Sequence, residues 1–461
     1  MSDFLYVKRI LFLLLLLFTA ACSVLRKDRF PDLTPGKDLY RDEGTDDSSG
    51  IAGIPWQELF TDPHLQDIIN TALTNNNDLR VARARMSRAE AALLQARLEF
   101  FPSLSANFNA SFQSKNPGGF GVPESYQLLA NTSWETGIWG RYRSLKRAAL
   151  ASFEQSRAYE LAVRTELIAM IAMNYYTLLG LDRKLEITEM TLDRRIRNEE
   201  AMKVMKENDI ITGADLVLSQ ANRYSAEVTI PDLKQQIYET ENSLKLLMGM
   251  EPGPIERGNL DEQSLPDELS TGVPIMLLSN RPDVLQAEYR LRAAFEMIRV
   301  AKSYFYPSLR INASWGIAAT SISGLLSSPL TVWNIIGGLT QPIFSAGLNR
   351  QRLVAARADQ EEALATFDKT LLNAGSEVAN AMHAYQTATE KISIRSKQIE
   401  YLEKSVEYTN ELLKYSNTTN YTDVLTAEVN LLSAQLNNVN DKLQQMQSIV
   451  TLYQSRGGGW K

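Results

Sequence analysis

An internal duplication constrains the fold of this chain more than any other feature. Residues 78–112 and 283–317 align at an offset of 205, so that the run from Phe100 to Leu104 matches the run from Phe305 to Leu309. Further on, Asp215 matches Asp423 at an offset of 208. We therefore divide the body into a first repeat, residues 51–270, and a second, residues 271–461. Each is predicted to contain a helix, β segments, a very long helix, a tip and a return helix.

Four segments of the two repeats alternate between apolar and polar side chains. From 103 to 113 every even position is apolar and every odd position is polar, and this period of two predicts a β-strand. The other segments are 126–136, 308–317 and 329–344, so strands are expected within about 103–138 and 308–344. A membrane strand of about 9–11 residues has this pattern. A half-buried strand of a soluble sandwich alternates equally well.

A long proline-free segment follows each β pair. Residues 141–207 contain one glycine, Gly180, and residues 348–416 contain one, Gly375. Good helix formers dominate both segments, so each is predicted to be a single helix. A helix of 67 residues at about 1.5 Å per residue is roughly 100 Å long. The spacing of Leu353, Ala356, Gln360, Ala363 and Phe367 is typical of closely packed coils.

The first 22 residues predict where the protein is located. Lys8 and Arg9 precede the apolar run 10–18, and small residues then lead to Cys22. This order is typical of a secretory signal, so residues 1–21 are predicted to be removed and the polar residues 22–50 to form a flexible leash. The site resembles a bacterial lipoprotein signal, which implies lipid on Cys22; an ordinary signal with a chance cysteine is the alternative. By the same analogy, Ser23 favours the outer membrane, and that location favours membrane strands.

Composition and motifs exclude several classes of function. The net charge is −6 and the chain has no basic blocks, which argues against nucleic-acid binding. One cysteine and two widely separated histidines exclude an intrachain disulfide and make a Cys/His zinc site untenable. Metalloprotease, nucleophile-elbow and phosphate-loop motifs are absent. We therefore predict a protein that is not an enzyme and that uses no metal or cofactor beyond the covalent lipid.

Four strands are too few to close a membrane barrel. Lipid does not tolerate open sheet edges, and the smallest closed membrane barrels have eight strands. The chain must therefore pool its strands with copies of itself. Three copies would supply twelve strands, which predicts a homotrimer.

Further motifs in both repeats give the chain a family resemblance. They are Trp56…Phe60-Thr61-Asp62-Pro63…Leu65, Trp134-Glu135…Gly137-Ile138-Trp139-Gly140-Arg141, Asn280-Arg281-Pro282-Asp283-Val284, Gln341-Pro342-Ile343-Phe344…Gly347 and Gly457-Gly458-Gly459-Trp460. Together they resemble the TolC family of outer-membrane factors, in the lipoprotein branch labelled NodT or OprM-like.

The resemblance implies a mainly α-helical fold with a membrane β-barrel. Three chains would form a 12-stranded barrel continuous with a 12-helix periplasmic tunnel. The expected function is the exit duct of a tripartite efflux or export system in the cell outer membrane. Its expected partners are a periplasmic adaptor and an inner-membrane pump of the resistance-nodulation-division type. The alternatives are a non-porous, trimeric coiled-coil surface lipoprotein and a lipoprotein enzyme.

The candidate gate lies at the two helical tips, at about 206–215 and 414–423. By resemblance, Asp423 forms a ring of three carboxylates at the constriction, and Asp215 is its counterpart in the first repeat. The ring is expected to be single because Thr426 stands where some relatives have a second aspartate. Asn417 replaces the usual glycine, and asparagine tolerates the left-handed backbone that such a tip needs. The alternative is that both aspartates only cap helix N-termini.

Overall fold

The computed structural model describes residues 30, 31, 33, 54–113, 122–263, 280–415 and 421–459. The chain divides into two compact units. The first contains residues 85–157 and 286–368 together with the described residues before 34, and the second contains the other described residues. Each unit therefore combines segments of both repeats.

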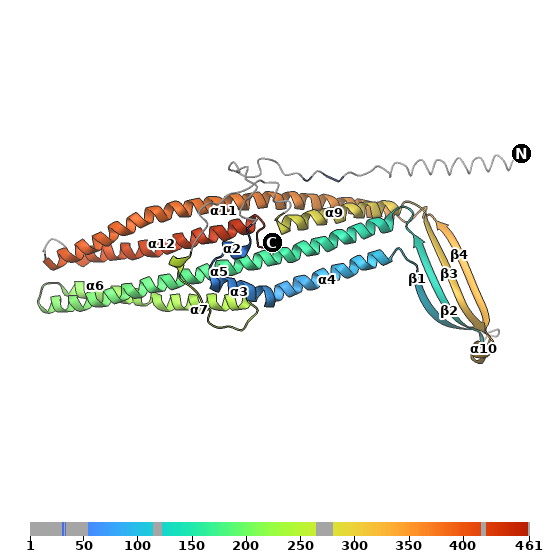
Figure 1. Ribbon diagram of the computed structural model, residues 1–461, viewed down its shortest axis with the longest axis horizontal. Helices are drawn as coiled ribbons and strands as arrows, with labels where there is room; N and C mark the ends of the chain where they lie inside the picture. The colour runs from blue at the N-terminus through green and yellow to red at the C-terminus, as the bar shows by residue number, and fades with distance from the viewer. Residues whose placement is uncertain are drawn as a thin grey trace. The chain divides into compact units, whose positions relative to one another are not determined.

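The first unit contains a four-stranded antiparallel sheet in the order β1-β2-β3-β4 (Figure 1). The strands are β1 (Ser103–Gln113), β2 (Val122–Thr136), β3 (Ser308–Ala319) and β4 (Leu330–Thr340). Pairing of β2 with β3 joins the two repeats, with Ala130 opposite Trp315. The predicted strands are therefore present and form one sheet.

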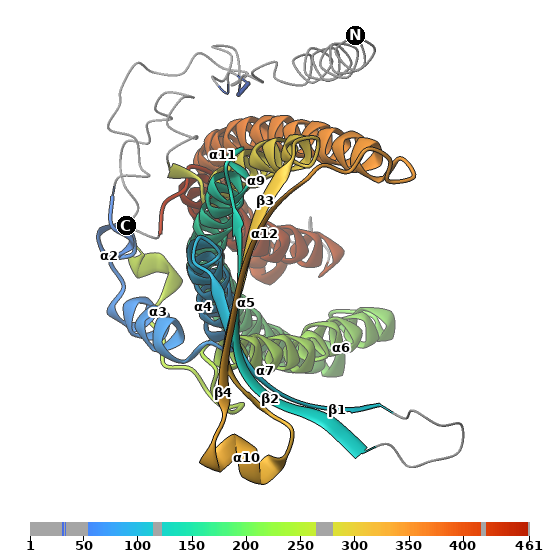
Figure 2. The same ribbon diagram turned by 90° about the vertical axis from the view of Figure 1, so that its right-hand side faces the viewer.

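Three features of the sheet differ from the prediction: the start of β2, the end of β4 and the connection between β3 and β4. β2 begins at Val122 rather than 126, and its Pro123 lies where the pairing with β1 shifts register, a position that tolerates proline. β4 ends at Thr340 rather than 344, because Pro342 has no N–H for a ladder. A short helix that was not predicted, α10 (Ile322–Ser327), connects β3 and β4 (Figure 2). The Ser321 side chain accepts a hydrogen bond from Gly324 N at its N-terminus.

Both long helices are present. α5 spans Arg141–Glu207 and α11 spans Leu348–Tyr415, against predictions of 141–207 and 348–416. In the first unit, Leu353 and the buried Ala356 pack against Ile298 and Ala301 of α9 (Pro282–Ser303). The other helices that precede the sheet strands are α2 (Trp56–Leu59), α3 (Pro63–Asn75) and α4 (Asn77–Leu98).

The two return helices are not alike. The second is continuous, α12 (Tyr421–Ser455), whereas the first is divided into α6 (Gly213–Glu227) and α7 (Thr229–Leu247). The single return helix predicted for the first repeat is therefore wrong. Pro231 explains the break, because its ring displaces the carbonyl four residues earlier and it has no N–H to donate.

In each repeat, a glycine with a left-handed backbone packs against an asparagine carbonyl near the start of the same repeat. Gly249 has φ of 67° and Gly457 has φ of 79°. A Cβ on Gly249 would lie 2.7 Å from the Asn75 carbonyl oxygen, and a Cβ on Gly457 would lie 2.2 Å from that of Asn280. Only glycine fits positions that combine this backbone with so close an approach. This contact gives the glycine-rich C-terminal motif a structural role.

In the second repeat, the buried Arg281 adds ion pairs and a backbone hydrogen bond near the same contact. The Arg281 guanidinium donates to Asp283 at 2.6 Å, to Glu377 at 2.7 Å and to the Ser455 carbonyl at 2.7 Å. The first carboxylate lies in the first turn of α9, and the other two partners belong to α11 and α12. Among the described residues, no helix has a stretch long and apolar enough to cross a membrane.

Candidate functional site

Large apolar side chains on one face of the sheet are not covered by any other described part of the chain. Their exposed fractions reach 79% at Leu104, 72% at Trp333 and 66% at Ile335. The register places these residues in rows that run across all four strands, one of which is Leu104, Thr132, Ala313 and Ile335. A soluble sandwich would bury such a face against a second sheet. In the described chain no second layer exists, so this face requires an apolar environment that the chain does not supply.

Two of the rows between these are mainly polar. Ser103, Ser133 and Asn312 lie opposite one another in a row that ends at Ile336 on β4. The next row on this face is polar throughout and consists of Ser105, Asn131, Ser314 and Asn334. The Ser133 hydroxyl donates to Asn312 Oδ1 at 2.8 Å, and these side chains line a shallow groove of about 310 Å³. One face of the sheet is therefore apolar and the other carries hydrogen-bonding groups, which is the two-sided chemistry of a membrane strand around an aqueous lumen.

Both edges of the sheet are open. β1 pairs only with β2, and β4 pairs only with β3. Each edge therefore has a row of backbone N–H and C=O groups without a strand partner in the described chain. Lipid would leave such groups unsatisfied, so a membrane location requires strands from further chains.

A cluster of aromatic and charged residues joins the strands to the long helix. Trp139 Nε1 donates to the Pro307 carbonyl at 2.6 Å, and its ring stacks on Tyr306 with centroids 5.0 Å apart. Glu135 binds Arg141 at 2.7 Å and Arg310 at 3.0 Å. These contacts connect the first repeat to the second at the start of α5. They explain the Trp-Glu…Trp-Gly-Arg motif as a structural junction.

At the tip of the first repeat, Asp215 is a helix-capping residue. Its carboxylate accepts from Thr212 N at 3.0 Å, and Asp215 N donates to Thr212 Oγ1 at 3.2 Å, which together form a capping box. Just before this, Asp209 takes a left-handed φ of 56°. The chain therefore turns between α5 and α6 through one left-handed residue and one reciprocal cap.

At the tip of the second repeat, Asp423 and Thr426 lie in the first turns of α12 and are both exposed. Their spacing of three places them on one helix face. Asn417 and the lipid site Cys22 lie outside the described residues. At the repeat offset of 208, the counterpart of Asn417 is Asp209, the residue with the left-handed backbone.

A buried polar cluster was not predicted. Asn198 Nδ2 donates to Glu428 Oε1 at 2.8 Å, and Arg195 donates to the Asn222 carbonyl. Arg195 and Glu428 retain only 5% and 8% exposure. Burial raises the pKa of Glu428, opposed by the Asn198 hydrogen bond and by Arg195. The cluster connects α5 to α6 and α12. Glu428 stands in the apolar pattern Val424, Ala427, Leu431, and a charge at such a core position was the available signal.

An exposed stripe on α11 was also missed. Its residues recur every seven positions and have exposed fractions of 61–86%: Ile394, Tyr401, Tyr408 and Tyr415. Seven-residue spacing is the pattern of a coiled-coil seam. In the described chain no helix covers this seam.

The sheet and the two long helices define a class of protein. A two-faced, open-edged sheet combined with helices of 67 and 68 residues is the protomer of a membrane channel with a helical extension. The model of the family "Outer membrane efflux protein" matches residues 68–250 and 273–458, one match in each repeat. The chain belongs to this family, and it is therefore a channel of the outer membrane and not an enzyme.

Individual relatives agree with this assignment. The chain is 29% identical over 438 residues to the solvent efflux pump outer membrane protein SrpC of Pseudomonas putida, with 92% of both chains covered. It is 26% identical to the cation efflux system protein CusC of Escherichia coli, with 74% of this chain and 75% of that one covered. Among solved structures, the outer-membrane channel OprN matches with a TM-score of 0.86 and 26% identity over 94% of this chain and 98% of that one.

Family membership contradicts the two alternatives, a non-porous rod and a lipoprotein enzyme. Within the described residues, moreover, no three His, Cys, Asp or Glu side chains group as a metal site.

Proposed function

We propose that three copies of this chain form a lipid-anchored exit duct of a tripartite efflux system. The observation that carries the proposal is the four-stranded sheet with one exposed apolar face and two open edges. Three such sheets joined edge to edge supply twelve strands and leave no backbone group unpaired toward lipid. The apolar rows then face lipid, and the serine and asparagine rows line the pore.

The exposed stripe on α11 supports the same assembly. Tyr401, Tyr408 and Tyr415 offer large, flat surfaces at coiled-coil spacing, and helices of neighbouring copies would cover them. The helical parts of three chains then form a tunnel that continues the pore on the periplasmic side.

Lipid on Cys22 is the proposed anchor. The basic, apolar and small segments before Cys22 support cleavage and acylation there. Several acyl chains hold a protein to a membrane firmly, whereas one chain holds it only reversibly. The mature protein would thus be attached to the outer membrane by its N-terminus and by its strands.

A periplasmic adaptor and an inner-membrane pump of the resistance-nodulation-division type are the proposed partners. The relatives are named for cations and for solvents although they share one family. This breadth supports a passive duct that receives cargo chosen by the pump and the adaptor.

Asp423 is the proposed gate residue, as a ring of three carboxylates. Its exposure in the first turn of α12 leaves the carboxylate near solvent, and threefold symmetry would bring three copies together on the axis. A ring of carboxylates favours cations. Thr426 on the same helix face supplies a hydroxyl and not a second charge. Asp215 has a capping role in its own repeat, and Asn417 is proposed to provide the left-handed residue of the second tip.

Reconstitution of the purified protein in planar lipid bilayers tests the channel function. The proposal predicts discrete conductance steps that favour cations. A chain with alanine at both Leu104 and Ile335, which weakens the apolar face, is expected to insert less often while giving steps of the same size. Insertion of the intact protein without conductance over a range of voltages would refute the channel.

A further inference from the structure

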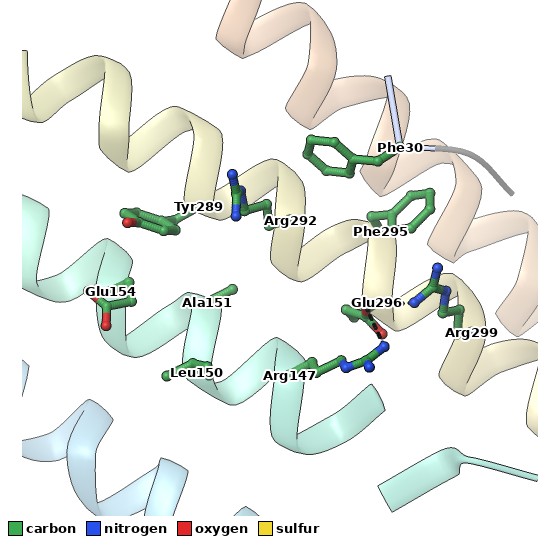
Figure 3. A pocket seen from close by; sticks show the side chains of 10 residues that line it. All are labelled: Phe30, Arg147, Leu150, Ala151, Glu154, Tyr289, Arg292, Phe295, Glu296 and Arg299. Carbon is green, nitrogen blue, oxygen red and sulfur yellow. Dashed lines mark hydrogen bonds and ion pairs between the residues drawn. The ribbon is translucent and has the colours of Figure 1, made fainter. Parts of the chain in front are cut away.

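A groove in the first unit lies between the start of α5 and the middle of α9 (Figure 3). With Phe30 as one of its walls it encloses about 460 Å³, and apolar groups from Leu150, Ala151 and Phe295 also line it. Phe295 is the most enclosed of these, with 5% exposure. The groove is thus an apolar depression on a helical surface.

The charges around this groove are already paired with one another. Glu296 binds Arg299 at 2.8 Å and Arg147 at 3.7 Å, and Arg292 pairs with Glu288. Because the arginines have carboxylate partners, the groove offers little to a charged ligand. The part of the groove that remains available for binding is aromatic and apolar, and such a surface suits an aromatic side chain.

Such a side chain is present, and it comes from the N-terminal segment of the chain. The Phe30 ring meets the Phe295 ring edge to face, with centroids 5.4 Å apart and planes at 89°. The Arg292 guanidinium lies 5.8 Å from the centre of the Phe30 ring. Edge-to-face pairing and a cation near the ring face are both favourable. Phe30 still retains 36% exposure, so the contact can open without unfolding the body.

We propose that this groove is the docking site of the protein's own N-terminal leash, with Phe30 as the anchor. The dock itself does not depend on the proposed acylation of Cys22. Only its effect on the position of the lipid rests on that proposal. Phe30 lies eight positions after Cys22, and an extended chain spans at most about 3.6 Å per position. A docked Phe30 therefore holds the lipid within roughly 29 Å of the groove. Without the dock, the same limit would be set by the 28 positions from Cys22 to residue 50, which is roughly 100 Å.

Limited proteolysis of the full mature protein tests the dock. Trypsin cleaves after Arg26, Lys27 and Arg29, on the N-terminal side of the anchor, and after Lys37 and Arg41, beyond it. Cleavage beside the anchor requires the undocked state, so its rate follows the population of that state. Phe295→Ala leaves the leash sequence unaltered and is expected to speed cleavage after Arg29 by about two- to tenfold. Cleavage after Lys37 provides the internal reference.

Two further variants isolate the contact. Met297→Ala changes an exposed residue of the same helix that lies outside the groove, and it should leave both rates unchanged. Phe30→Ala alters only the leash and cannot unfold the body, and it should speed cleavage after Lys27 to a similar extent. Unchanged rates in both Phe295→Ala and Phe30→Ala would overturn the proposal.

The same digest tests the dock and the lipid anchor independently. The mass of the N-terminal fragment reports whether Cys22 carries acyl chains. A fragment without lipid would refute the anchor while the cleavage rates still test the dock, and unchanged rates would refute the dock while the anchor stands.

Discussion

A positive charge on the apolar face of the sheet should prevent stable insertion, whereas the same charge on the polar face should not. Ile335 is the central residue of β4, and Asn334 next to it points to the opposite face because side chains alternate along a strand. Arginine on the lipid face costs about 2–4 kcal/mol at the membrane midplane. Three copies of Ile335→Arg therefore destabilise a trimer by roughly 6–12 kcal/mol. Asn334→Arg keeps its charge in the aqueous lumen and should cost little.

Urea unfolding of both variants in lipid vesicles measures this difference. Ile335→Arg should lose most of its folded trimer or require far less urea to unfold. Asn334→Arg should unfold near the wild-type midpoint and pass fewer cations. Equal midpoints for the two variants would refute the assignment of the faces, and a larger loss in Asn334→Arg would reverse it.

Three further predictions concern the gate, the anchor and the buried cluster. Asp423→Ala should reduce cation selectivity in bilayers; its control, Asp215→Ala, should lose about 1 kcal/mol of stability with selectivity unchanged. Cys22→Ser should abolish fatty-acid labelling, and labelling that persists would contradict the anchor. Because burial raises the pKa of Glu428 above its ordinary 4.5, the folded protein holds this proton more tightly than the unfolded chain, and stability falls as pH rises from about 4.5 through the folded pKa. Glu428→Gln should flatten that decline in thermal unfolding measured from about pH 4 to 8, and an unaltered slope would contradict it.

The regular elements were predictable because they depend on short-range patterns. Alternation over residues 103–113 reflects a strand with one apolar face, and the absence of proline from 141–207 reflects an uninterrupted helix. Because the two repeats align, each pattern occurs twice in the sequence. The predictions failed where one residue acts on a neighbour, as when Pro231 divides the first return helix and Pro342 ends β4.

The partners of each side chain were harder to predict, because they depend on distant segments. Glu428 meets Asn198, which lies 230 residues earlier, and Phe30 meets Phe295 across a similar separation. Asp215 shows the limit in another way. Its type and place fitted both a gate and a cap, and only the 3.0 Å and 3.2 Å hydrogen bonds to Thr212 reveal its part in a capping box. The α11 stripe became visible only when exposure showed that no helix covers it.

Cross-linking of the two sheet edges tests most directly whether copies pool their strands. Ser105→Cys on β1 and Asn334→Cys on β4 lie in one row at opposite edges, about 14 Å apart across three strand spacings. A thiol reagent shorter than about 10 Å cannot join them within a chain. In the double variant the account predicts dimers and trimers on a denaturing gel, with no larger species, and no trimers in either single variant. Monomers alone, or a ladder that continues beyond three chains, would contradict a closed trimer.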